Sequence, residues 1–447
     1  KERIRQLIAE YAGDVSSLYQ HGRIQYVQKL SETYRFFHNE LEFIEVFKVQ
    51  SGFNVIAGNP PWIKLIFEEK GILSETFPEV VIRKTSASSV KKYYSSTLVE
   101  KSIKISYYDE YIETESISNF IGSLQNYYYL KGQQSNLYKA IIINGLNQIS
   151  EDGYLGLLHP ESIYDDPNGN LLRNKVFKHL RFHFQFVNTL KLFPEILHWV
   201  TYGANIYSGE YLENICFKSI YNLYHPYTIE NSFLHKGIGN CGGLKVKDEK
   251  SSSYIWNQLP HKERIITINK DVLRLFAKLN KDQGDCSSVK LMSIHSTHIL
   301  AILDKFSRNR MRINDIDHKT FMGWDENQAQ QEGIIKRETR WANINNYELI
   351  LNGPHFYISQ LLYKSPKRIC DKPLDYSTID LQLIDTQFQT RTNFIPSEDI
   401  ESFTNRFKYL GERWIDKYKL VLSRRLSLSG ERTLQVSLAP PRVSHIN

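Results

Sequence analysis

The sequence predicts an α/β fold with a mostly parallel sheet, followed by a domain of α+β type. Short apolar segments of strand length alternate with segments in which apolar residues recur at helical spacing. Strands that alternate with helices favour parallel pairing through right-handed crossovers. The last third of the chain differs, because basic clusters and aromatic residues are interleaved there without this alternation.

The N-terminal half supplies these segments in order. Residues 1–50 are expected to be helical, since Ile4, Leu7, Ile8 and Tyr11 recur at helical spacing. A buried strand is expected at 53–58, and a polar, Tyr-rich helical insertion follows it. The remaining segments are a helix at 136–149, a strand at 154–159, a helix at 173–181, a strand at 182–190 and a pair of strands within 199–208.

The tetrapeptide Asn59-Pro60-Pro61-Trp62 follows the first expected strand and is the most informative feature of the chain. Neither proline has an N–H and each has a fixed φ, so the turn presents preset acceptors. The Asn59 side-chain oxygen and a carbonyl of the Pro-Pro segment can both accept hydrogen bonds from one NH2 group. The Trp62 ring offers a face on which a flipped-out base can stack. The alternative is a proline-rich turn with Trp62 in the core.

This arrangement suits an aromatic amine such as N6 of adenine. The amine is a poor nucleophile because its lone pair is delocalised into the ring. Two acceptors that pull on its protons favour a pyramidal nitrogen, whose lone pair then points at an electrophilic methyl group. Positioning and electrostatics carry most of such catalysis, and no base of unusual pKa is required before the attack.

Around the tetrapeptide the chain resembles the γ-type N6-adenine DNA methyltransferases of restriction–modification systems, including their large fused forms. The family's hallmark is Gly-Asn-Pro-Pro followed by an aromatic residue. Large members also carry an acidic-aromatic stretch upstream, and then an Asn-Leu-Tyr helix, a glycine turn and a strand that ends in proline. The matching segments here are Gly58 to Trp62, His38 to Phe47, Asn136 to Tyr138, and Gly153 to Pro160.

The resemblance implies a Rossmann-like methyltransferase catalytic half and a target-recognition domain after it. It also implies S-adenosylmethionine as cofactor, double-stranded DNA as substrate, and a bacterial restriction–modification or antiphage defence system with other subunits as partners. The expected organisation is a helical remnant at 1–50, a catalytic region at 51–285 with its helical insertion at 63–135, and a DNA-binding domain at 286–447.

Residue roles follow from the motif and the resemblance. Asn59, Pro60 and Pro61 would hold the target amine, and Trp62 would stack on the adenine. Tyr207 can give a second stacking face, as can Tyr202, with core packing as the alternative for both. The resemblance places Asn136 near the junction of cofactor and base, with a helix N-cap as the alternative role. His159 is expected to be a structural hydrogen bonder.

The methyl-donor site is expected upstream of this chain. In the order of motifs typical of the family, a Gly-rich turn and an acidic residue after the second strand precede the tetrapeptide. Residues 1–52 contain neither a Gly-x-Gly nor a strand–turn–helix pattern around one. The spacing Gly237-Ile238-Gly239-Asn240-Cys241-Gly242 is a weak match, because no convincing strand precedes it.

Candidate DNA-binding residues lie in the C-terminal segment. Arg308, Arg310 and Arg312 alternate, so on a strand they would share one face. Further candidates are Lys367, Arg368 and Arg391, since Lys and Arg bind phosphate and Arg reads base edges. The alternative is a solvated basic face over a second core.

Composition sets broad limits. The net charge of +7 permits a polyanionic partner without requiring one. The four cysteines are scattered without a Cys-x-x-Cys pair, which is typical of free thiols in a reducing cytoplasm and predicts no metal site. No apolar stretch is long enough to span a membrane.

Two other functions stay open at this point. One is a methyltransferase that acts on protein or RNA, since the tetrapeptide also occurs in such enzymes. The other is a noncatalytic DNA-binding or complex-forming component with a methyltransferase fold, which the missing donor site makes plausible.

Overall fold

The computed structural model divides the chain into two compact units, Lys1–Arg310 and Met311–Asn447, which are taken separately below. Residues 286–310 therefore lie with the first unit, whereas the second domain is expected from residue 286. The structure describes residues 19–68, 74, 82, 101–248, 253–281, 284–309, 311–312, 315–341, 347–357, 362–372, 374–409, 411–423 and 436–446.

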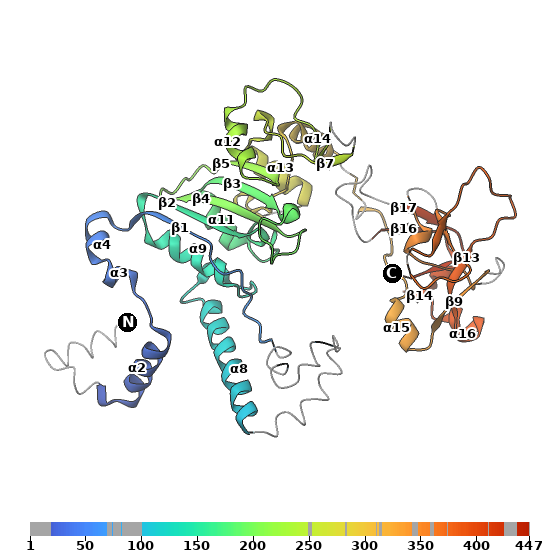
Figure 1. Cartoon of the computed structure of the whole chain (residues 1–447), viewed down its shortest axis with the longest axis horizontal. Helices are drawn as coiled ribbons and strands as arrows, with labels where there is room; N and C mark the ends of the chain where they lie inside the picture. Colours follow the sequence, from blue (N-terminus) through green and yellow to red (C-terminus); the bar gives the residue numbers. More distant parts are fainter. Residues whose placement is uncertain are drawn as a thin grey trace. The chain divides into compact units, whose positions relative to one another are not determined.

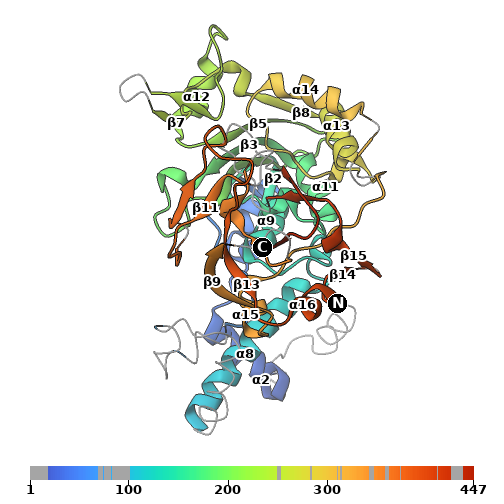
Figure 2. The same ribbon diagram turned by 90° about the vertical axis from the view of Figure 1, so that its right-hand side faces the viewer.

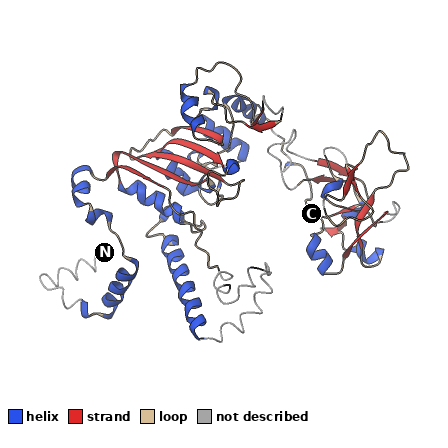
Figure 3. Ribbon diagram, in the orientation of Figure 1, coloured by secondary structure: helices blue, strands red, loops and turns tan. Residues whose placement is uncertain are grey.

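A six-stranded mixed sheet forms the centre of the first unit, with the order β1-β2-β4-β3-β5-β8 (Figures 1 and 3). β1 runs parallel to β2 and β3 runs parallel to β5. β4 is antiparallel to both of its neighbours and β8 is antiparallel to β5, so the expectation of a mostly parallel sheet is wrong. The strands are β1 (Phe53–Gly58), β2 (Ile149–Pro160), β3 (Leu180–Val187), β4 (Thr201–Ser208), β5 (Cys216–Leu223) and β8 (Ile266–Asn269).

Helices connect and cover these strands. The α-helices described in this unit are α2 (Gly22–Tyr34), α3 (Asn39–Glu42), α4 (Ile44–Gln50), α8 (Lys101–Gly122), α9 (Leu137–Gln148), α10 (Ser162–Asp165), α11 (Asn170–His179), α12 (Tyr227–Leu234), α13 (Lys270–Asn280) and α14 (Thr297–Ser307). A small hairpin joins β6 (Lys245–Lys247) to β7 (Tyr254–Trp256). None of the described helices combines the length and the hydropathy that a bilayer crossing needs.

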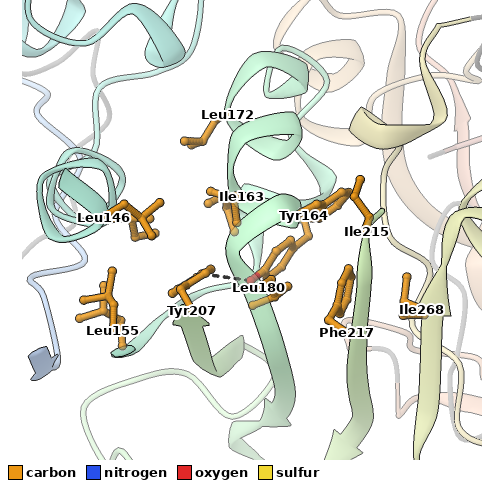
Figure 4. Close-up of a cluster of buried hydrophobic side chains, with 14 of the residues drawn as sticks. Leu146, Leu155, Ile163, Tyr164, Leu172, Leu180, Tyr207, Ile215, Phe217 and Ile268 are labelled. Carbon is orange, nitrogen blue, oxygen red and sulfur yellow. Dashed lines mark hydrogen bonds between the residues drawn. The ribbon is translucent and has the colours of Figure 1, made fainter. Parts of the chain in front are cut away.

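The main core lies between the sheet and the helices α9, α11 and α13. Apolar side chains from these elements converge on one face of the strands, as Figure 4 shows for Leu146 of α9, Leu172 of α11 and Phe217 of β5. A second cluster, which includes Phe184, Phe186 and Tyr202, covers part of the opposite face. Strands β3, β4 and β5 contribute buried side chains to both clusters, so these strands are packed on both faces.

β1 differs from the other strands because it lies at the edge of the sheet. Val55 in its centre is 68% exposed, and Asn54, Ala57 and Gly58 are exposed as well. The expectation of a buried strand at 53–58 is therefore wrong, although the strand itself is present with the expected bounds. An apolar edge strand of this kind is a surface on which another strand can pair.

Other expected elements differ in extent. The strand pair within 199–208 is one strand, β4, and the strand expected at 182–190 ends at Val187 before a 3-10 turn, η3 (Asn188–Leu190). The helical insertion contains α8 and the turn η2 (Tyr128–Leu130), whereas residues 69–100, apart from 74 and 82, lie outside the described residues. Residues 1–18 also lie outside them.

The second unit is built from short paired strands around its own core. β9 (Ile335–Trp341) pairs with β13 (Arg391–Pro396), and β11 (Lys364–Pro366) pairs with β12 (Tyr376–Thr378) (Figure 2). Its core is rich in aromatic residues such as Phe394, Phe403 and Phe407. Further elements are α15 (Glu326–Gln331), β10 (Ile350–Leu351), η7 (Gly353–His355), α16 (Ile400–Asn405), β14 (Lys408–Tyr409), β15 (Glu412–Arg413), η8 (Trp414–Asp416), β16 (Lys419–Leu422), β17 (Val436–Ala439) and β18 (Ser444–His445).

Candidate active site

The tetrapeptide lies at the carboxyl end of β1, as the sequence predicts. Because β1 is parallel to β2, with Gly58 opposite Leu157, Asn59 emerges beside the end of β2 at His159 and Pro160. Asn59 and Pro61 are exposed, whereas Pro60 is buried and anchors the turn. The Asn59 amide is therefore open to a ligand at the edge of the sheet where α/β proteins bind their ligands.

Trp62 is fixed in place by one hydrogen bond and two ring contacts. Its indole Nε1 donates to the carbonyl oxygen of Leu158 at 3.1 Å. Its ring lies 5.6 Å from that of Phe193 and 5.7 Å from that of Tyr202, measured between centroids. The indole is half-buried, so its orientation is preset and part of the ring remains accessible.

Asn136 lies directly beside the segment that follows the tetrapeptide. It forms an antiparallel bridge with Lys64, and Leu137 N donates to the carbonyl oxygen of Ile63 at 3.1 Å. Asn136 holds the N-cap position of α9, yet its side chain makes no capping hydrogen bond. Its Oδ1 is buried and has no hydrogen-bond partner within the described part of the chain. A buried acceptor without a hydrogen bond lowers the stability of the fold, and a ligand that donates to it would remove this cost.

A buried polar network lies behind the end of β2 and escaped prediction. The Glu161 carboxylate accepts from Nε2 of His183, 3.0 Å from Oε2, and from Nε2 of Gln185 at 2.9 Å. Beside it, Tyr164 donates to Oδ1 of Asn205 at 2.7 Å. Burial by itself would raise the pKa of the Glu161 carboxyl, but His183 and then Gln185 hold it below its usual value.

His159 is the neutral member of this region. Its Nδ1 lies 2.9 Å from the carbonyl oxygen of Pro160 and its Nε2 lies 2.7 Å from the hydroxyl of Tyr207. An imidazole that donates from Nδ1 and accepts at Nε2 satisfies both contacts without a charge. Burial lowers the pKa of His159 to about 4, and the ring therefore stays neutral at pH 7.

Acid is expected to destabilise the first unit through His159. The unfolded chain binds a proton below the usual pKa of 6.5 and the folded chain does so only near 4, so stability is lost as pH falls through this window. A shift of this size corresponds to about 3 kcal/mol. In thermal unfolding between pH 7 and 4, His159→Gln should lose less stability than the wild type, whereas the exposed His198→Gln should follow the wild type.

Tyr207 is fully buried between β4 and the helices and is hydrogen-bonded to His159. It therefore presents no face to an incoming base, and the second stacking face predicted for it is wrong. Tyr202 is also buried and packs parallel to Phe186 at 5.4 Å, which is the core-packing alternative.

In the second unit, three of the predicted DNA-binding residues meet in one groove. Lys367, Arg368 and Arg391 line a cavity of about 640 Å3 between the β11–β12 hairpin and β13, together with Trp341 and Asp380. The Arg391 guanidinium lies 4.3 Å from the centroid of the Trp341 ring. Lys367 and Arg368 are exposed, so the groove combines cations with an aromatic face.

The other three predicted residues fall at the boundary between the two units. Arg308 caps the C-terminus of α14 and pairs with Asp304 in the first unit. Arg312 belongs to the second unit, and Arg310 lies outside the described residues. Neither Arg308 nor Arg312 lies in a strand, which the expected alternation requires.

No Gly-rich turn that joins a strand to a helix, of the kind that cradles a nucleotide cofactor, occurs among the described residues. The Gly237–Gly242 segment follows α12 and precedes β6, so it is not the turn between a strand and a helix that a nucleotide cradle uses. Its glycines have positive φ, which serves the turn itself. No group of metal-binding side chains occurs among the described residues, and the four cysteines are free.

Comparison with known proteins finds weak structural neighbours among restriction–modification enzymes. No protein-family model and no curated protein matches the chain. The DNA-bound ATP-dependent type ISP restriction–modification enzyme LlaBIII is 14% identical with a TM-score of 0.22, over 42% of this chain and 11% of that one. A modification subunit assigned to a type I restriction enzyme of Vibrio vulnificus YJ016 is 7% identical with a TM-score of 0.21, over 37% of this chain and 32% of that one. Scores this low carry no argument about mechanism.

Proposed function

We propose that this chain is the base-binding and DNA-recognition part of an S-adenosylmethionine-dependent methyltransferase that modifies N6 of adenine in double-stranded DNA. Bacterial restriction–modification or antiphage defence is its proposed setting, with other defence subunits as partners. The observation that carries the proposal is the exposed Asn59 amide at the carboxyl end of β1, next to a Trp62 ring of fixed orientation.

Asn59 and the Pro-Pro segment would act as a two-point acceptor. Hydrogen bonds from both protons of the adenine amine, one to Asn59 Oδ1 and one to a prolyl carbonyl oxygen, draw the nitrogen lone pair out of conjugation. The accessible part of Trp62 would hold the purine ring against the turn. The reactive methyl group would come from S-adenosylmethionine.

The free edge of β1 supports a donor site outside the described sheet. A sheet can continue beyond an exposed, apolar edge strand such as β1, whose Val55 is 68% exposed. Strands paired there in parallel with β1 would end beside Asn59, at the edge where a cofactor must lie to meet the amine. The buried Oδ1 of Asn136 has no hydrogen-bond partner among the described residues. It is then free to accept a hydrogen bond from the cofactor or the base where the two meet.

The groove of the second unit is the proposed DNA contact. Lys367 and Arg368 would bind phosphates, while the Arg391 guanidinium and the exposed Trp341 ring beside it would contact base or sugar. The logarithm of protein–DNA affinity falls linearly with the logarithm of the salt concentration, and the slope is proportional to the number of phosphates neutralised.

Removal of two groove cations is expected to weaken binding and its salt dependence. In Lys367→Ala/Arg368→Ala the slope of log affinity against log salt should become shallower by about 2, as measured by fluorescence anisotropy. Lys336→Ala/Lys408→Ala removes the same charge from exposed positions outside the groove and should leave the slope near that of the wild type. Equal slopes for the two variants contradict a role for the groove.

The proposed function is tested by transfer of labelled methyl from S-adenosylmethionine to duplex DNA by the full-length protein. Label on N6 of adenine supports it. Label on protein or RNA moves the chain to another class of methyltransferase. Salt-sensitive DNA binding without any transfer favours the noncatalytic component, which the missing cofactor cradle among the described residues keeps as the second candidate.

A further inference from the structure

The loop between β3 and β4 carries large apolar side chains that stay exposed. Leu197 and Trp199 are 56% and 62% exposed, and Leu190 and Leu192 are 44% and 41% exposed. Single exposed apolar residues are ordinary, but a group of them beside a candidate site marks a binding surface.

Asn188 fixes the shape of this loop from inside. It is fully buried, and its Nδ2 donates to the carbonyl oxygens of Phe193 and Ile196, both at 2.8 Å. Its Oδ1 accepts from the Phe193 N–H at 3.1 Å, and its own N–H donates to the carbonyl oxygen of Val200 at 3.1 Å. The exposed side chains are thus presented on a preorganised backbone.

The loop lies at the same edge of the sheet as Asn59. β3 and β2 are both antiparallel to β4, so the ends of β1, β2 and β3 point the same way. Within the loop, the Phe193 ring lies 5.6 Å from that of Trp62. Trp199 precedes Tyr202 by three residues, and the Tyr202 ring lies 5.7 Å from that of Trp62.

We infer that Trp199, with Leu197 beside it, is a wedge that enters the base stack when adenine leaves the duplex. This inference rests on the proposed function. Extrusion of a base costs a few kcal/mol of stacking and pairing, and an apolar side chain inserted into the gap recovers part of that cost. An indole has a large stacking face and two side-chain torsions to immobilise, which suits it to this role.

The test uses the full-length protein and the DNA that the wild type methylates, in two forms. In one form the target adenine is paired with thymine, and in the other it faces an abasic site, where extrusion costs least. Trp199→Ala should lower the single-turnover rate on the paired target by about 10- to 100-fold, the equivalent of the lost stacking. On the abasic form the variant should be within about threefold of the wild type, because little flipping energy is then needed.

Two further variants control the interpretation. Trp199→Phe keeps a ring and should retain most of the activity on paired DNA. Tyr254→Ala removes a ring that is 70% exposed on the β6–β7 hairpin, and it should match the wild type on both substrates.

The possible results separate the wedge from the proposed function. An active wild type with an unaffected Trp199→Ala variant overturns the wedge, and so does an equal loss on both DNA forms, which indicates a role in folding or in another contact. A folded wild type that methylates no duplex overturns the proposed function itself.

Discussion

Asn59→Ala is expected to lower the rate of methyl transfer to adenine by about 100- to 1000-fold, the usual cost of removing one preorganised polar contact to the reacting group. The amide of Asn59 is exposed at the end of β1 and is not part of the core, so its loss should leave the fold intact. The main loss should appear in the rate of the chemical step rather than in DNA affinity, because the phosphate contacts lie elsewhere. Single-turnover transfer of labelled methyl measures that step directly.

Asn54→Ala is the matched control for this experiment. Asn54 is an exposed amide on the same strand, but it precedes the carboxyl end of β1 and cannot reach a base held there. Its replacement should change the rate by less than about threefold. If Asn59→Ala and Asn54→Ala behave alike, the tetrapeptide is a structural turn and the two-point acceptor model is wrong.

The sequence predicted the strand and the turn of this candidate site because their determinants are local. An apolar run, a glycine and two prolines fix a strand and its end within ten residues, and β1 indeed ends at Gly58. Likewise Gly153 to Pro160 predicted a strand whose end meets that of β1, and the parallel register confirms the meeting.

Strand order could not be predicted in the same way, because it depends on pairing between distant segments. Thr201–Ser208 inserts antiparallel between β2 and β3, so these two strands, which are consecutive along the chain, are not neighbours in the sheet. The chain turns back between β3 and β4 at Lys191, whose left-handed φ of 52° is unusual for a lysine and is not predicted by its residue type. The same limit applies to β1, whose edge position depends on what else pairs with it.

The buried polar network around Glu161 was not predicted, although β3 carries a sequence signal for it. In β3 the residues Phe182, Phe184 and Phe186 alternate with His183 and Gln185, so one face is apolar and the other polar. The polar side chains of His183 and Gln185 both donate hydrogen bonds to the Glu161 carboxylate. An alternating polar face on a central strand therefore predicts a buried partner, and Glu161 is the nearest carboxylate after β2.

The basic clusters show why charge spacing alone misleads. Arg308 and Arg312 lie on either side of the boundary between the two units, and no strand carries them. Lys367 and Arg391 are far apart in sequence, yet the pairing of β11 and β13 with their neighbours brings them to one groove. Spatial clustering came from the hairpins, which the sequence did not reveal.

His183→Leu is expected to lower the free energy of unfolding of the first unit by about 3–5 kcal/mol. His183 is fully buried and its Nε2 lies 3.1 Å from Oε1 and 3.0 Å from Oε2 of Glu161. Without it, the amide of Gln185 is the one side-chain donor to the buried carboxylate that remains among the described residues. Urea unfolding monitored by near-UV circular dichroism at pH 7 measures the loss.

The double variant Glu161→Gln/His183→Leu separates the charge from the packing. It removes the uncompensated carboxylate and keeps the same leucine packing at residue 183. It should therefore be more stable than His183→Leu by at least about 1–2 kcal/mol. The two should also differ in pH dependence. In the single variant burial raises the pKa of Glu161 above its unfolded value, so the deficit should shrink as pH falls from 8 towards 5, when the carboxyl takes up a proton in the folded state. The double variant has no such group, and a deficit that shrinks equally in both would show that the Glu161 charge is not what His183 stabilises.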